Sequence, residues 1–190
     1  MKIMSLDAEY NQPSGKTIQI GAAIFDSKTG QLIDKFESYV DPKEKINDGK
    51  DGNTNIIELT GIKDSDVLGA PSIQEVYEML KNFHKKNKCF KNPLVWGSGS
   101  SNDSQHIYNE VFQTIELKKQ NPNFMGHRVI DVKGLYQSIQ IFNNNQVRGG
   151  LKTVCEKLNI GFEGEAHRAL NDAINTFRVW HFLIKKFNIN

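Results

Sequence analysis

The sequence contains few of the residues that define disulfide-bonded or membrane-spanning proteins. Its 190 residues include only two cysteines, Cys89 and Cys155, which are too few and too far apart for a disulfide framework or a cysteine zinc cluster. No apolar run approaches the roughly 18 to 20 residues that a membrane-spanning helix needs. A net charge of +2 does not by itself indicate a nucleic-acid partner, because such a partner requires positive charge concentrated on one surface. Composition and net charge therefore do not define the function, and the sequence motifs must indicate it.

The N-terminal segment has acidic residues where a secretory signal has its apolar core. Asp7 and Glu9 occupy that position, and no small-residue cleavage pattern follows them. We therefore expect an intracellular protein, located in the cytoplasm and without membrane contact. The length fits one domain over residues 1–190, because roughly 150 residues per domain is the usual expectation.

Hydrophobic periodicity and turn residues predict an α/β domain. Alternating or continuous apolar runs predict strands at 3–9, 17–25, 32–40, 93–96 and 129–132. Apolar residues at three- and four-residue spacing predict helices at 55–61, 72–83, 107–115, 135–142, 151–158 and 166–187. Three strands joined by short turns, followed by strands that alternate with helices, indicate a mixed five-stranded sheet with helices on both faces.

Four carboxylates occupy positions that favour chemistry over a purely structural role. Asp7 and Glu9 end the first predicted strand at i and i+2, so both project from one face and could share Mg²⁺ or Mn²⁺. A solvated strand end is the alternative interpretation of this pair. Asp103 follows a glycine- and serine-rich turn, where an ordinary helix cap is the alternative.

The C-terminal motif combines a histidine with the fourth carboxylate, Asp172. A five-residue separation turns two side chains of a helix about 140° apart, so His167 and Asp172 do not share one helical face. We therefore expect His167 at the entrance of the last helix, from which it could swing over a site that Asp172 also approaches. The alternative is a histidine hydrogen-bonded to backbone beside a solvated aspartate.

Taken together, these motifs resemble the DEDDh 3′ to 5′ exonucleases, which include polymerase proofreading exonucleases and RNase T and have an RNase H-like fold. The resemblance rests on Asp7-Ala8-Glu9, on Asp103, and on His167-Arg168-Ala169-Leu170-Asn171-Asp172, with further matches at Ile18-Gln19-Ile20-Gly21-Ala22 and Leu59-Thr60-Gly61-Ile62. Two positions depart from the family. Tyr10 stands where threonine is common, and Asn102 stands where an aromatic residue usually precedes the aspartate.

The resemblance implies a two-cation phosphodiester hydrolysis that releases nucleoside monophosphates from a 3′ end. The metal ligands would be Asp7, Glu9, Asp103 and Asp172, and His167 would be the general base. The expected cofactors are two divalent cations, Mg²⁺ or Mn²⁺. The residues expected to bind substrate are Ala8, Tyr10, Arg148, Lys152 and Arg168.

The expected partner is a single-stranded RNA or DNA 3′ end, with RNA favoured over DNA. The resemblance also leaves a homodimer open. Two other functions stay open from the sequence alone. The first is a non-catalytic nucleic-acid-binding or interaction module on the same fold, which the irregular segment around Asn102 favours. The second and weaker one is a metal-dependent hydrolase of other phosphate esters. The intact carboxylate set argues against the non-catalytic module.

Overall fold

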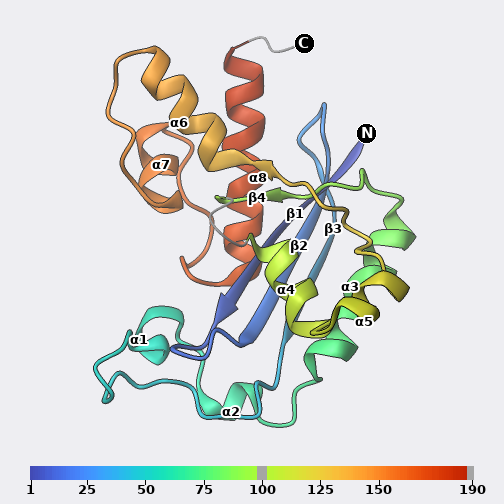
Figure 1. The fold of residues 1–190 in the computed structure, drawn as a ribbon. Coiled ribbons are helices and arrows are strands. Elements are labelled where there is room, and N and C mark those ends of the chain that lie inside the picture. Colours follow the sequence, from blue (N-terminus) through green and yellow to red (C-terminus); the bar gives the residue numbers. More distant parts are fainter. Residues whose placement is uncertain (98–101, 188–190) are drawn as a thin grey trace.

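The computed structural model describes residues 1–97 and 102–187, which form a sheet covered by helices on both faces (Figure 1). Within these residues the sheet has five strands in the order β3-β2-β1-β4-β5. Its strands are β1 (Lys2–Tyr10), β2 (Thr17–Asp26), β3 (Leu32–Tyr39), β4 (Leu94–Val95) and β5 (Ile130–Asp131). The first three strands form an antiparallel meander, and β4 and β5 continue from β1 in parallel. The predicted mixed sheet is confirmed.

The helices divide between the two faces of the sheet according to the alternation of the strands. They are α1 (Ile56–Thr60), α2 (Asp64–Val67), α3 (Ile73–Asn87), α4 (Asp103–Val111), α5 (Ile115–Gln120), α6 (Val132–Phe142), α7 (Leu151–Lys157) and α8 (Ala169–Lys186). One buried cluster joins Ile3, Ala23 and Phe25 to α6, α7 and α8, and a second joins Met4, Leu6 and Ile24 to α3 and α4. Neighbouring residues of a strand point to opposite faces, so each strand contributes to both cores.

The register of β1 against β2 places two residues of β2 beside the acidic pair. Asp7 pairs with Gly21, and Glu9 pairs with Gln19. The pairing becomes irregular between Glu9 and Tyr10, where β1 ends. The short β4 pairs in parallel with β1 at Ser5 and leads toward the start of α4. Because β1 and β4 run in parallel, they end at the same edge of the sheet.

Two predicted helices differ from the structure. The helix expected to carry Ile107, Val111 and Ile115 is two helices, because α4 ends at Val111 and α5 begins at Ile115. Phe112 leaves helical geometry with φ −112° and ψ 86°, and its ring packs against Tyr77 with centroids 5.4 Å apart. The last helix begins at Ala169 and not at 166. The short α2 was not expected.

Two expectations from the sequence concern specific segments. The glycine- and serine-rich turn expected before Asp103 lies largely outside the described residues, since these stop at 97 and resume at 102. Among the described helices, none is both long enough and apolar enough to cross a membrane.

Candidate active site

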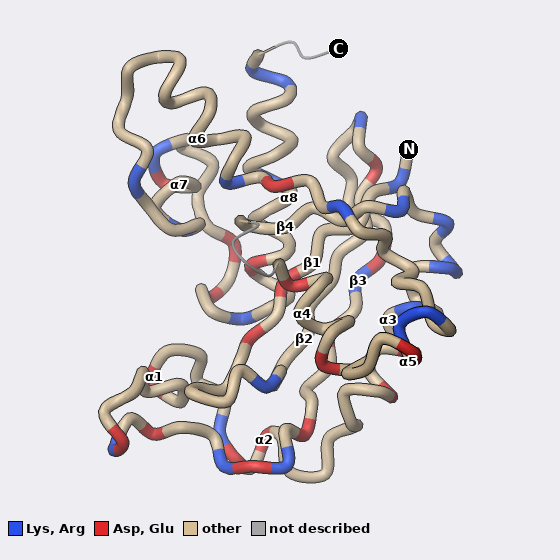
Figure 2. Tube along the Cα trace, in the orientation of Figure 1, with Lys and Arg blue, Asp and Glu red and all other residues tan. Residues whose placement is uncertain are grey.

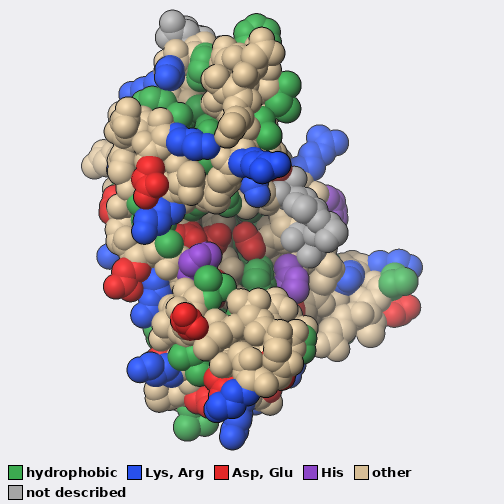
Figure 3. Space-filling view, turned by 90° about the vertical axis from the view of Figure 1, so that its left-hand side faces the viewer, with side chains coloured by type: hydrophobic (Ala, Val, Ile, Leu, Met, Phe, Trp, Pro, Cys, Tyr) green, Lys and Arg blue, Asp and Glu red, His purple; other side chains and the backbone are tan. Residues whose placement is uncertain are grey.

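Four carboxylates from three separate elements converge at one end of the sheet. Strand β1 contributes Asp7 and Glu9, α4 contributes Asp103 as its first residue, and α8 contributes Asp172 in its first turn. Acidic positions of the three elements gather between β1, α4 and α8 (Figure 2). In the space-filling view, acidic side chains lie in a hollow flanked by histidines (Figure 3). The convergence that the sequence motifs predict is present in the structure.

Strand β2 holds the start of α8 against the acidic pair, although it contributes no carboxylate. A Cβ atom on Gly21 would lie 2.1 Å from the backbone nitrogen of Leu170, so only glycine permits this approach. Gln19 is buried, and its Oε1 accepts a hydrogen bond from the Ala169 N–H at 3.0 Å. The amide of Gln19 also donates to Glu37 at 3.1 Å. These contacts set the position of α8, and with it the position of Asp172.

Sequence reasoning did not assign a role to Gln19 or Gly21, although both lie in a segment that matches the family. A signal was available. Gln19 is a polar residue within the otherwise apolar run of the second predicted strand, and a buried polar side chain requires hydrogen-bond partners. The partner itself lies 150 residues away, in α8, and sequence periodicity gives no information about that pairing.

His167 stands at the entrance of α8, as expected, in a backbone conformation that is uncommon for a residue other than glycine. Its φ is +59°, in the left-handed region. The backbone N–H of His167 hydrogen-bonds to the Asp172 carboxylate, and its side chain is exposed. Ligand atoms of Glu9, His167 and Asp172 all lie within 4.8 Å of one another. The left-handed turn therefore holds an accessible imidazole beside two of the carboxylates.

The electrostatics of the site are those of buried like charges. Burial and then the charge of Asp172 raise the pKa of Glu9 to about 8. Burial also raises the pKa of Asp7 well above its ordinary value, and the charges of Asp103, Glu9 and Asp172 add to the rise. The pKa values of Asp103 and Asp172 rise to about 6, in both cases mainly through burial. Each carboxylate opposes the ionisation of its neighbours.

The donor set fits divalent cations. Asp172 Oδ1 is buried and has no hydrogen-bond partner among the described residues, although a buried oxygen of this kind normally has one. Carboxylate oxygens are the ligands that Mg²⁺ and Mn²⁺ prefer. Cations held by Asp7, Glu9, Asp103 and Asp172 would supply the positive charge that this cluster lacks and a partner for the unbonded oxygen.

Asp103 is not the cap of α4, contrary to one interpretation of the sequence. The cap is Asn102, whose side chain accepts a hydrogen bond from the Gln105 N–H at 3.0 Å. Asp103 instead accepts a hydrogen bond from the Tyr10 hydroxyl at 2.7 Å. The carboxylate of Asp103 is therefore directed toward the end of β1.

The residues predicted to bind substrate differ in how they are placed. Ala8 is buried in the core beneath α3 and α4, which leaves only its backbone for a ligand. Arg168 donates to the Tyr39 hydroxyl at 3.2 Å and lies 3.9 Å from the Glu165 carboxylate. Arg148 precedes α7 and Lys152 lies within it, and both are exposed. Their contacts with substrate stay predictions.

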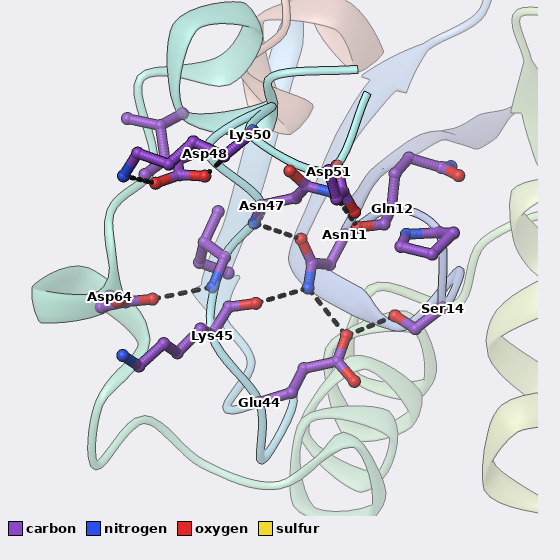
Figure 4. Close-up of a pocket in the computed structure, with 13 residues that line it drawn as sticks. Asn11, Gln12, Ser14, Glu44, Lys45, Asn47, Asp48, Lys50, Asp51 and Asp64 are labelled. Atoms are coloured by element: carbon purple, nitrogen blue, oxygen red, sulfur yellow. Dashed lines mark hydrogen bonds and ion pairs between the residues drawn. The ribbon is translucent and has the colours of Figure 1, made fainter. Parts of the chain in front are cut away.

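A polar cavity of about 650 Å³ lies beside the loop that follows β1 (Figure 4). Asn11 lines this cavity and makes three side-chain hydrogen bonds there. The Asn11 amide donates to Glu44 Oε1 at 2.7 Å and to the Lys45 carbonyl at 2.9 Å, and its oxygen accepts from the Asn47 N–H at 2.9 Å. None of the predicted site residues lines this cavity. The hydrogen bonds of Asn11 fasten the segment around residues 44–47 to the chain directly after Tyr10.

Comparisons with known proteins agree with this arrangement. The profile of the RNase T family, described as exonuclease, matches residues 4–180. The PolC-type DNA polymerase III of Halalkalibacterium halodurans is 30% identical over 181 residues, which are 95% of this chain and 11% of that polymerase. A second PolC-type polymerase, from Oceanobacillus iheyensis, is 31% identical over 80% of this chain and 9% of its own length. The chain thus spans about a tenth of these curated relatives.

Solved structures with the same fold include nucleases. The nuclease domain of 3′hExo, a DEDDh family member bound to rAMP, has a TM-score of 0.77 and 21% identity, over 97% of this chain and 92% of that one. The Mg²⁺- and Mn²⁺-bound form of S. pombe Pop2p has a TM-score of 0.70 and 18% identity, over 98% of this chain and 84% of that one. Both likenesses cover nearly the whole chain.

The sheet brings four carboxylates and a histidine together, and its fold is the one found in the nuclease domain of 3′hExo. The chain belongs to the RNase T family, which is described as exonuclease, because the family profile matches residues 4–180.

Proposed function

We propose that the chain is a metal-dependent 3′ to 5′ exonuclease that releases nucleoside monophosphates from single-stranded nucleic acid, with RNA preferred over DNA. The observation that carries this proposal is the convergence of Asp7, Glu9 and Asp172 around one buried acidic pocket, with His167 exposed at its edge. Asp103 completes the set from the side of α4.

The four carboxylates would hold two divalent cations, Mg²⁺ or Mn²⁺. Such cations lower the pKa of water so that hydroxide forms near neutral pH, and they stabilise charge on the attacking and leaving oxygens. The charges of the three other carboxylates all raise the pKa of Asp7, so Asp7 lies close to each of them. Glu9 and Asp172, which approach each other closely, would hold the cations together with Asp7 and Asp103.

His167 would accept the proton of the attacking water. Imidazole is the side chain most often used as a general base, and a base must reach the proton that it removes. The exposed ring of His167 stands at the rim of the pocket, with its backbone fastened to Asp172. The left-handed backbone at this residue fixes where the ring leaves the chain, while the ring itself stays free to turn.

Two observations on similar proteins bear on the substrate. The nuclease domain of 3′hExo binds rAMP, a ribonucleoside monophosphate, which supports RNA and a mononucleotide product. The PolC-type relatives are DNA polymerases, and this similarity favours single-stranded DNA as a second candidate. Because the chain spans only about a tenth of those polymerases, RNA and DNA must be compared directly.

The test uses single-stranded RNA and DNA oligonucleotides of one sequence, each labelled at the 5′ end, with Mg²⁺ or Mn²⁺ titrated from zero. We expect labelled products that shorten stepwise from the 3′ end, faster for RNA, and no cleavage when EDTA is present. Asp7→Asn serves as the inactive control. A labelled mononucleotide as the first product would overturn the direction. Binding without metal-stimulated cleavage would overturn the catalytic function.

A further inference from the structure

We propose that Tyr10 is a positioning residue that orients the Asp103 carboxylate for cation binding. The Tyr10 hydroxyl donates a hydrogen bond to Asp103 Oδ1 at 2.7 Å, across 93 residues of sequence. This inference rests on the proposed function, because it assigns a supporting role within the same metal site. The proposed role also explains why a tyrosine could replace the threonine that is common at this position in the DEDDh exonucleases.

The end of β1 serves the site in two ways. Glu9 and Tyr10 are adjacent on a strand, so their side chains leave it in different directions. Glu9 approaches Asp172 of α8, whereas Tyr10 reaches Asp103 of α4. The register irregularity between these two residues lies at this point. One strand end therefore supplies a ligand and also holds a ligand that another element supplies.

Asp103 requires an external partner because of its place in α4. It is the first residue of the helix, and because Asn102 caps that end through the Gln105 N–H, the Asp103 side chain takes no part in the cap. A carboxylate that binds a cation is normally held by hydrogen bonds from neighbouring groups. A phenol provides one strong donor at the end of a rigid ring, whereas a threonine hydroxyl sits directly on Cβ and would not extend this far.

The ring of Tyr10 is itself fixed by α4. Its edge packs against the imidazole of His106, with ring centroids 4.4 Å apart and planes at 60°. His106 stands three residues after Asp103, on the same side of the helix, and its Nε2 lies 2.8 Å from the Gly15 carbonyl oxygen. The two residues of α4 thus contact the hydroxyl and the ring of one tyrosine.

A third residue of α4 also contacts the β1–β2 hairpin. Glu110 accepts hydrogen bonds from the Thr17 hydroxyl at 2.5 Å and from the Thr17 N–H at 3.1 Å. Asp103, His106 and Glu110 are spaced by three and four residues, so they share one face of the helix. This face lies along the hairpin that joins β1 to β2, which fixes the direction in which the helix presents Asp103.

The test compares Tyr10→Phe with Tyr108→Phe. Tyr10→Phe removes the hydroxyl and keeps the ring on His106. Tyr108 belongs to the same helix, is buried, and its hydroxyl donates to the carbonyls of Asn121 at 2.8 Å and Lys118 at 3.1 Å. Mn²⁺ binding is measured by calorimetry on the substrate-free protein, and the Mn²⁺ concentration for half-maximal cleavage is measured separately.

For Tyr10→Phe we expect Mn²⁺ binding weaker by roughly 10- to 100-fold, the usual effect of removing a group that orients a metal ligand. We expect kcat to return to within a few-fold of the unmodified protein when Mn²⁺ saturates. Tyr108→Phe should lower only the melting temperature. Unchanged Mn²⁺ affinity in Tyr10→Phe, or an equal loss in both variants, would overturn the role of Tyr10. Absence of Mn²⁺ binding by the unmodified protein would overturn the proposed function itself.

Discussion

The carboxylates of the candidate site and the carboxylate of Asp34, between β3 and α3, are the same chemical group in opposite surroundings. Asp34 of β3 accepts hydrogen bonds from Asn87 at 3.0 Å and from Lys86 at 3.1 Å, and these partners lower its pKa. At the site, burial and neighbouring negative charges raise the pKa of Glu9 to about 8. An acidic group stabilises the fold where it has donors and cations around it, and it opposes folding where it has only other acids.

Without a bound cation, the buried acidic cluster therefore lowers the stability of the fold, whereas Asp34 raises it. Metal-binding sites place like charges where only a bound cation compensates them.

His167→Ala should lower kcat by roughly 10²- to 10⁴-fold, because a positioned acid or base usually contributes that much. The fold should remain, since the side chain is exposed and its contact with Asp172 runs through the backbone N–H. Single-turnover cleavage at saturating Mn²⁺ measures the effect, and His127→Ala, at another exposed histidine, is the control. Full activity of His167→Ala with normal Mn²⁺ binding would disprove the role of general base.

Glu9→Gln should stabilise the cation-free protein at high pH while it impairs catalysis. The raised pKa means that folded protein keeps a proton on Glu9 up to about pH 8, whereas unfolded protein loses it near the ordinary value of 4.5. Stability should therefore fall as pH rises between these values, and glutamine removes this loss. Urea unfolding in EDTA should show a gain on the order of 1–3 kcal/mol at pH 8 and little gain at pH 5.

The control for Glu9→Gln is Glu116→Gln, which changes an exposed glutamate of α5. Its stability should match that of the unmodified protein at both pH values. If Glu9→Gln is no more stable than the unmodified protein at pH 8, Glu9 does not oppose folding, and the contrast with Asp34 fails.

Asp34→Asn should change the free energy of unfolding the least, and it should lower stability where Glu9→Gln raises it. Because the folded-state pKa of Asp34 is lowered, the ionised group stabilises the fold above the unfolded pKa, near 3.8, and this gain is lost as pH falls through the lower folded value. A loss of roughly 0.2–1 kcal/mol is expected at pH 7, as for other partly exposed ion pairs. Thermal unfolding should show the difference shrinking as the pH falls below 3.8. A difference that persists there would point to packing and not to charge.

Much of the fold could be predicted from the sequence because its elements depend on local patterns. Alternation in the first strand, Ser72 as a helix cap, and Gly61 after a short helix all appear in the structure. The break between α4 and α5 was missed although it has a local signal: Thr114 caps α5 by accepting a hydrogen bond from the Leu117 N–H at 3.2 Å. Local periodicity continues across that break.

The sequence indicated which acidic residues and which histidine would lie together, but not the residues that hold them in position. Acidic residues at strand and helix ends, together with the histidine motif, indicated which residues would meet. Gln19, Gly21 and the hydroxyl of Tyr10 act through partners more than 90 residues away. Such pairings depend on strand register and helix placement, which only the assembled fold determines.

The close packing of α8 on Gly21 has a consequence for protein synthesis. The ribosome makes β1 and β2 first, and the helix that bears Asp172 emerges long afterwards. Until that helix docks, a nascent chain has an incomplete set of ligands and lacks the imidazole. The order of synthesis therefore makes the docking of α8 on Gly21 the step that completes the carboxylate cluster.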